Sequence, residues 1–260
     1  MYIANLMKAE FKRAFLGEFR YPLWYLGQIA GRFVVLATVF LGANYLGGTT
    51  SDSVLVTGAL LNILVLILAL ESTNSVGTTI VSETRIGTIQ QLFVSPISFP
   101  ALLVIRDVAA FFAQFPAFVV QVLLLKLVFG VSLYVPLALI LPVLFTMRLG
   151  MLGFGFLFGA GNIMFQRTNL LNILTNVLML PTILVNEGNI SGALRTVANL
   201  FPLTKADLVV QGVMLHGVET AYWEGLLRLM SSSAVFLFVG LAVFRVFLKM
   251  SLKRGLVGQY

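Results

Sequence analysis

The sequence predicts an all-α integral membrane protein in which six transmembrane helices follow an amphipathic interfacial helix. Of its 260 residues, 59% are hydrophobic and only 10% are charged, whereas about 25% of the residues in an ordinary soluble domain are charged. Several apolar runs reach the roughly 20 residues that a spanning helix needs. Lys and Arg also gather in alternate connecting segments. We therefore expect residues 1–260 to form a single transmembrane domain.

Residues 1–22 have the pattern of a helix that lies in the membrane interface. At about 100° per residue, Ile3 and Phe11 fall on an apolar side, and Lys8 and Lys12 fall on the opposite, basic side. A basic amphipathic helix of this kind is typical of membrane surfaces. A packed helix of a soluble domain is the alternative, but no soluble sequence follows.

Six apolar runs predict the transmembrane helices. They cover residues 27–46, 53–75, 99–125, 133–164, 170–185 and 225–247. An even number of spans places both termini on the same side. The segments on that side hold nine Lys and Arg residues, whereas the long opposite loop holds only Arg195 and Lys205. By the positive-inside rule, both termini are expected in the cytoplasm of a multi-pass protein of the cell membrane.

Residues 186–224 form the largest predicted outer loop. This segment is long and only half polar, and its apolar spacing predicts one or two short helices broken at Pro202. We expect part of it to re-enter the outer leaflet. Non-helical backbone at that depth must be buried in protein or face water.

Residues 82–96 form a polar interruption between the second and third predicted spans, on the cytoplasmic side. Ser82 is a candidate N-cap of a short helix that ends before Pro96. Gly87 would let another backbone approach closely. The apolar face of this helix consists of Ile86, Ile89 and Phe93, and its other faces carry Glu83, Arg85, Gln90 and Gln91. Two interpretations stay open at this point, a docking helix for a partner and an interfacial connector.

The spacing Glu83-x3-Gly87-Thr88-Ile89-x2-Leu92-x2-Ser95-Pro96 resembles the signature of ABC type-2 exporter permeases. These are the membrane subunits of ATP-binding-cassette transporters, and the segment forms their coupling helix. The layout of basic helix, six spans and large outer loop is also similar. The run NLFPLT at 199–204 resembles the Asn-Pro-[Leu/Phe]-Thr segment of drug-type members, with two residues inserted.

This resemblance implies a permease that dimerises with a second permease chain, the same or homologous, and that docks onto separate ATPase subunits. The chain contains no Gly-x4-Gly-Lys-[Ser/Thr] phosphate loop, so ATP and Mg would be bound by those subunits and this chain would not itself be an enzyme. No cofactor is expected in this chain, and its surroundings would be membrane lipid and not nucleic acid. The residues that would dock on the ATPase are Glu83, Arg85, Ile86, Gly87, Thr88, Ile89, Gln90, Gln91, Leu92 and Phe93.

The resemblance leaves the cargo open. Export of an amphipathic small molecule, similar to a drug or an antibiotic, or of a lipid is favoured, because few polar residues are available to line a cavity. Export of a lipid-linked saccharide by the same mechanism is the alternative.

Charged residues within the predicted spans are the other candidates for function, because such residues usually face a partner or water. Arg32 and Glu71 both fall in the inner third of their spans, so we expect them to pair. Arg148 has no evident partner at its depth and is expected to face a cavity. Arg106 and Asp107, near the inner end of the third span, are expected to be structural.

Two other function classes are compatible with these charges. An ion-driven transporter could use Arg32, Glu71 and Arg148. A membrane enzyme acting on lipid would have only Glu71 and Asp107 as acids, with no partner base. The chain has one histidine and no cysteine, so the usual zinc motifs are excluded.

Glycine pairs predict close helix packing. Gly155-x3-Gly159 lies in the fourth span and Gly27-x3-Gly31 at the start of the first. Small residues four apart let two helix backbones approach each other in a membrane. The sequence does not indicate which helix each pair would contact.

Overall fold

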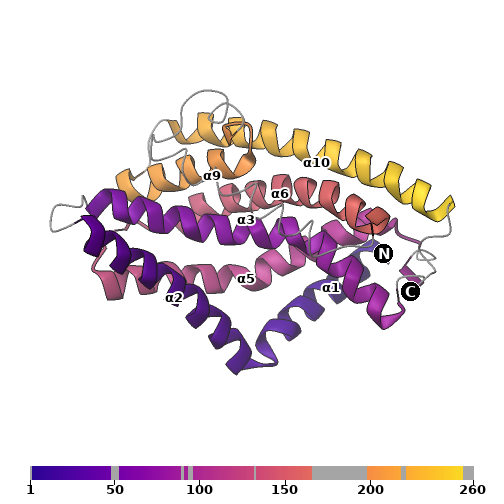
Figure 1. Ribbon diagram of the computed structural model, residues 1–260, viewed down its shortest axis with the longest axis horizontal. Coiled ribbons are helices and arrows are strands. Elements are labelled where there is room, and N and C mark those ends of the chain that lie inside the picture. Colours follow the sequence, from indigo (N-terminus) through magenta and orange to yellow (C-terminus); the bar gives the residue numbers. More distant parts are fainter. Residues whose placement is uncertain are drawn as a thin grey trace.

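The computed structural model describes residues 2–47, 53–88, 91–92, 96–131, 133–165, 198–217 and 221–253. These residues are helical or lie in turns, and none of them lies in a strand. Figure 1 shows long helices that run side by side. The helices are α1 (Tyr2–Phe19), α2 (Pro22–Gly47), α3 (Ser53–Ile86), α5 (Phe99–Phe129), α6 (Leu137–Phe165), α9 (Pro202–Gln211), the π-helix η2 (Gly212–His216) and α10 (Ala221–Lys253).

Five of these helices, α2, α3, α5, α6 and α10, are long and apolar enough to cross a membrane. The chain is therefore all-helical over its described part and has the character of a multi-pass membrane protein. Five of the six predicted spans coincide with these helices. The remaining one, residues 170–185, lies outside the described residues.

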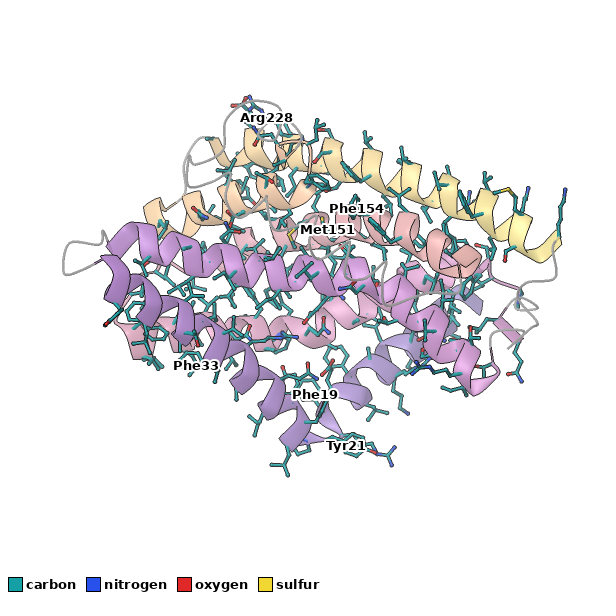
Figure 2. All side chains as sticks on the ribbon, viewed as in Figure 1. Phe19, Tyr21, Phe33, Met151, Phe154 and Arg228 are labelled. Carbon is teal, nitrogen blue, oxygen red and sulfur yellow. The ribbon has the colours of Figure 1, made fainter. Side chains whose placement is uncertain are left out.

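Helices α1 and α2 form a V that rests on the rest of the bundle (Figure 1). Phe19 and Tyr21 lie at its apex (Figure 2), and Pro22 begins α2, as expected for a proline at a helix start. Helix α1 packs against α5, where the rings of Phe11 and Phe112 lie 5.8 Å apart. Of the most apolar window of α2, only 11% is buried. The outer face of α2 is thus left for lipid or for another chain.

Helix α3 is the central helix of the bundle. Of its most apolar window, 72% is buried, and Leu60, Leu61, Leu64 and Val65 are almost fully enclosed. A helix that is apolar on all sides is expected at such a position. Helices α6 and α9 pack against α3, and α10 covers α6 on its other side.

Glycines allow α6 to approach both of its neighbours. A Cβ added to Gly155 would lie 2.6 Å from the Thr73 carbonyl oxygen of α3. Gly159 faces Val76 of α3, and Gly153 faces Gly240 of α10 at backbone contact. The first predicted glycine pair is therefore used at a close helix contact.

The second predicted glycine pair is not used in this way within the described chain. A Cβ added to Gly27 or Gly31 would meet no atom within 4 Å. The reason is the splayed position of α2, whose N-terminal half stands away from the bundle beside α1 (Figure 1). Neither glycine therefore contributes to packing among the described residues.

Helix α9 begins at Pro202, the residue at which the sequence predicts a break. The hydroxyl of Thr204 donates to the carbonyl oxygen of Ala198 over 2.8 Å and ties the start of the helix to the preceding turn. Helix α9 packs against α3, α6 and α10. The position of this region relative to a membrane stays a prediction.

The predicted start of a short helix at Ser82 is wrong. Helix α3 continues to Ile86, and the Ser82 hydroxyl donates to the Thr79 carbonyl oxygen within that helix over 2.9 Å. No residue before Gly87 breaks the helix. Gly87 ends it with φ 78°. The N–H groups of Gly87 and Thr88 donate to the carbonyl oxygens of Thr84 and Glu83, which is the Schellman pattern.

The close approach of α6 and α10 leads us to expect that a larger side chain at Gly153 lowers the stability of the fold. Gly153→Leu should destabilise the fold by about 3 kcal/mol or more, because its side chain would fall on the backbone of α10. Gly31→Leu, on the open N-terminal half of α2, should keep or raise the melting midpoint, because leucine favours helix more than glycine does. Both effects are measured by heating the purified variants in detergent and recording the temperature at which the monodisperse peak is lost. Equal midpoints for the two variants would contradict the described α6–α10 contact.

Candidate functional site

A cluster of charged side chains joins three helices where α3 ends. Arg106 of α5 donates from Nη1 to Glu83 Oε1 of α3 over 2.6 Å and from Nε to Glu10 Oε1 of α1 over 3.2 Å. Arg13 of α1 adds longer ion pairs, 3.8 Å to Glu83 and 3.9 Å to Glu10. The end of α3 is thus tied to α1 and α5 by charge-assisted hydrogen bonds, which are stronger than neutral ones.

Within this cluster, Glu83 is engaged on both carboxylate oxygens. Arg106 contacts one, and the hydroxyl of Thr88, just past the Gly87 turn, donates to the other. The Glu83 side chain is only 8% exposed. Its predicted role as a docking group therefore has to be restated, because the carboxylate faces inward and links the turn to α5.

The residues next to Glu83 point the other way. Arg85 is exposed, and Ile86 is 71% exposed at the tip of α3. Gln91 is exposed and Leu92 is half-buried against the bundle. Ile89, Gln90 and Phe93, also predicted docking residues, lie outside the described residues. The tip of α3 thus presents Arg85 and Ile86 outward and keeps Glu83 inside.

The second cluster lies deeper, where Arg148 of α6 meets Asp107 of α5. Two parallel hydrogen bonds of 3.1 Å join the guanidinium to the carboxylate, and Arg148 Nη1 donates to Gln114 Oε1 over 3.0 Å. The two side chains are 3% and 1% exposed. The prediction that Arg148 lacks a partner is wrong. Counted along their separate predicted spans, Arg148 and Asp107 lie at different depths. In the structure α5 and α6 are shifted along their axes, so that the two side chains meet.

Helix α3 also takes part in this second cluster. Ser72 Oγ lies 3.1 Å from Asp107 Oδ2 and 2.9 Å from the Arg148 carbonyl oxygen. Its single proton can serve either acceptor. Three helices therefore meet at one buried ion pair whose two carboxylate oxygens both accept hydrogen bonds, an arrangement that makes a buried charge more tolerable. Neither Ser72 nor Gln114 stands out in the sequence, because a single polar residue in an apolar run gives no signal of its partner.

Arg32 and Glu71 form the ion pair that the sequence predicts, between Arg32 Nη2 and Glu71 Oε1. Glu71 lies halfway along α3 rather than near its inner end, because α3 extends well past the predicted span. The other oxygen, Glu71 Oε2, is buried and has no hydrogen-bond partner among the described residues. The pair therefore leaves one carboxylate oxygen without a partner among the described side chains.

Two neighbouring cavities form what we call the polar groove, between α1, α3, α5 and α6. Their volumes are about 460 Å³ and about 320 Å³, and both are lined by Ser75, Thr78 and Ala110. Glu71 and Arg148 line the first cavity, so Arg148 faces a cavity as predicted even though it is paired. Seven charged side chains line the groove, namely Glu10, Arg13, Glu18, Glu71, Arg106, Asp107 and Arg148.

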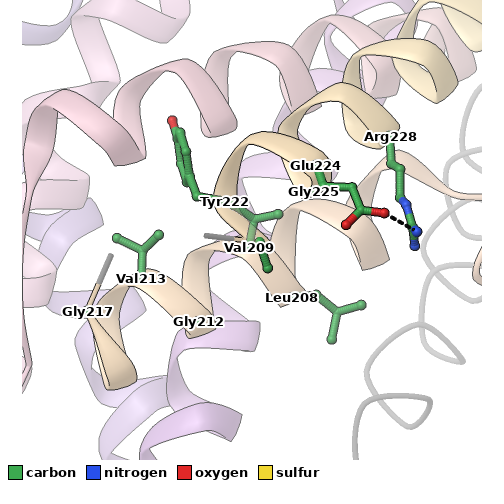
Figure 3. A pocket seen from close by; sticks show the side chains of 10 residues that line it. Leu208, Val209, Gly212, Val213, Gly217, Tyr222, Glu224, Gly225 and Arg228 are labelled. Carbon is green, nitrogen blue, oxygen red and sulfur yellow. Dashed lines mark hydrogen bonds and ion pairs between the residues drawn. The ribbon is translucent and has the colours of Figure 1, made fainter. Parts of the chain in front are cut away.

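A smaller cavity of about 210 Å³ lies between α9, η2 and α10 (Figure 3). Its walls are mostly apolar, with Leu208, Val209 and Val213 on one side and Tyr222 on the other. Its rim carries the Glu224–Arg228 ion pair. Burial, and then repulsion from Arg228, lowers the pKa of Lys205 in α9.

Comparison with protein-family models, with curated proteins and with solved structures finds no match to this chain. The fold and the charge clusters define the class, a multi-pass helical membrane protein with ion pairs buried between its spans. Any assignment beyond that class rests on the chain's own residues.

The buried ion pair makes a second prediction. Arg148→Met should destabilise the protein by about 3–5 kcal/mol, because Asp107 would stay charged and unpaired. The double variant Arg148→Met/Asp107→Leu should recover most of this loss, because an apolar pair leaves no buried charge. Melting midpoints of both variants and of Asp107→Leu alone give the coupling energy. Additive losses in the double variant would show that the two side chains do not depend on each other.

Proposed function

We propose that this chain is the membrane-spanning subunit of an ATP-driven ABC exporter. It would dimerise with a second permease chain and be driven by separate ATPase subunits that bind ATP and Mg. The observation that carries the proposal is the junction at Gly87. There α3 ends in a Schellman turn at Gly87. Glu83, the glutamate of the permease-like signature, is bound by Arg106 of α5, and Arg106 also binds Glu10 of α1.

The junction supports a division of labour between neighbouring residues. Arg85 and Ile86 are exposed and suited to contact a partner. Glu83 is buried and suited to pass displacement on, because a push at the Gly87 turn acts on its carboxylate through Thr88. Helix α3 would carry the same push to Ser72, next to the Arg148–Asp107 pair.

The cargo that we propose is an amphipathic small molecule or a lipid. Apolar spans with one mixed polar groove suit a molecule of this kind better than a long saccharide, although export of a lipid-linked saccharide is the alternative. An ion-coupled transporter is a second candidate, favoured by the unpaired Glu71 Oε2 at the groove. Uptake into ATP-free vesicles under an ion gradient would favour that candidate.

The coupling role can be tested with two neighbouring substitutions. Arg85→Glu should weaken co-purification of the ATPase subunit about tenfold or more, because the exposed docking charge is reversed. Glu83→Gln should leave co-purification intact but reduce transport per ATP hydrolysed, because the link to Arg106 loses its charge. Pull-down from native membranes and coupled ATPase and transport assays in proteoliposomes measure the two effects.

Lys253→Glu provides the matched control, since it reverses a charge at the exposed end of α10, on another helix. It should change neither quantity. If no ATP-binding subunit co-purifies with the unaltered chain, or if Arg85→Glu binds it as well as the unaltered chain does, the proposal is wrong.

Orientation can be measured directly, because the chain has no cysteine. Single cysteines at Arg85 and at Asn199, both exposed, should react with an impermeant maleimide from opposite sides of the membrane. Asn199→Cys should label in intact cells, and Arg85→Cys only after the membrane is opened. The reverse pattern would place the α3 tip outside the cytoplasm and remove it from any cytoplasmic ATPase.

A further inference from the structure

We propose that the polar groove is a binding site for an amphipathic organic cation, a positive group carried on an apolar body. The inference rests on the proposed function, since it names the class of cargo. It is drawn from the charges, the unsatisfied oxygen and the apolar walls of the groove.

The charge of the groove favours a cation. Four carboxylates and three arginines line it, which leaves a net charge of −1 when all are ionised. Arg32, the partner of Glu71, and Glu83, the partner of Arg106, add one charge of each sign and leave this net charge unchanged. The whole chain has a net charge of +7. With these groups ionised, the described lining of the groove is negative in a basic protein, and local fields of this kind select ligands by sign.

Two of the three arginines of the groove are firmly paired. Arg106 is held by Glu83 and Glu10, and Arg148 by Asp107 and Gln114. The third, Arg13, is 62% exposed and makes only ion pairs of 3.8 and 3.9 Å with Glu83 and Glu10. A guanidinium that is paired as Arg106 and Arg148 are has little attraction left for an anion. The excess charge must therefore come from a carboxylate without a partner.

Two carboxylates have capacity left for a cation. Glu18 lines the groove and has neither a hydrogen bond nor an ion pair among the described residues. Glu71 Oε2 is buried and unbonded. A cation bound in the groove beside Glu71 would satisfy the buried oxygen, which is costly to leave unpaired.

The remaining walls suit the apolar body of such a ligand. Ile67 and Leu70 line the cavity beside Glu71, and Val76 and Leu103 line the cavity beside Glu18. The two volumes, about 460 Å³ and about 320 Å³, fall within the roughly 300–1,000 Å³ of small-molecule sites. Thr78 lines both cavities and is exposed between them.

The test compares two probes of nearly equal shape and opposite charge, tetraphenylphosphonium and tetraphenylborate. Binding of each to the full chain in nanodiscs of zwitterionic lipid is measured by equilibrium dialysis, with empty nanodiscs subtracted. We expect saturable binding of the cation and none of the anion. Glu18→Gln should raise the Kd for tetraphenylphosphonium about tenfold. Thr78→Trp should abolish saturable binding by filling the groove.

Glu224→Gln is the matched control, because it removes an exposed carboxylate of α10 far from the groove, and it should leave the Kd unchanged. Melting midpoints show that each variant is folded. Equal binding of both probes, or an unchanged Kd in Glu18→Gln, would overturn the inference. No ATPase takes part, so failure of the coupling proposal would show in the pull-down, whereas failure of this proposal shows only in the dialysis.

Discussion

A charge buried in an apolar bundle has to be paired, and this constraint organises the whole structure. The Arg148–Asp107 pair is its strictest case, since both side chains are almost fully enclosed and joined by two parallel hydrogen bonds. Such a pair is tolerable when further hydrogen bonds accompany the contact between the two charges. Gln114 and Ser72 supply them. The relative positions of α3, α5 and α6 are thereby fixed at one point.

Helix α3 connects this point to the other charges. Along a single helix it carries Glu71, which pairs with α2, Ser72, which contacts α5 and α6, and Glu83, which is tied to α5 and α1. Glycines allow α6 to pack closely against both α3 and α10. A helix held along one side by close packing and at three levels by polar contacts transmits displacement as a rigid body. This is the property that a subunit driven from its cytoplasmic end would need.

The sequence was sufficient for the features that depend on local pattern. Apolar length placed five helices, Pro202 marked the start of α9, and the opposite charges of Arg32 and Glu71 predicted their pair. The sequence was insufficient where a contact between side chains depends on the axial position of one helix relative to another. The partner of Arg148 followed from an axial offset that no single span records, and the partners of Gly155 and Gly159 followed from the packing of α6. The end of α3 was misplaced because Ser82 resembles a cap, whereas only Gly87 supplies the left-handed turn.

The central claim is that the tip of α3 receives force from an ATP-binding partner. It is tested most directly by placing a photo-crosslinking amino acid at Ile86, whose side chain is exposed at that tip. Irradiation of membranes from the native host should yield one adduct, and its peptides should come from a protein with a phosphate-binding loop. The same probe at Phe238, exposed on α10, should yield none. An Ile86 probe that labels only lipid, or a partner with no nucleotide-binding sequence, would contradict the account.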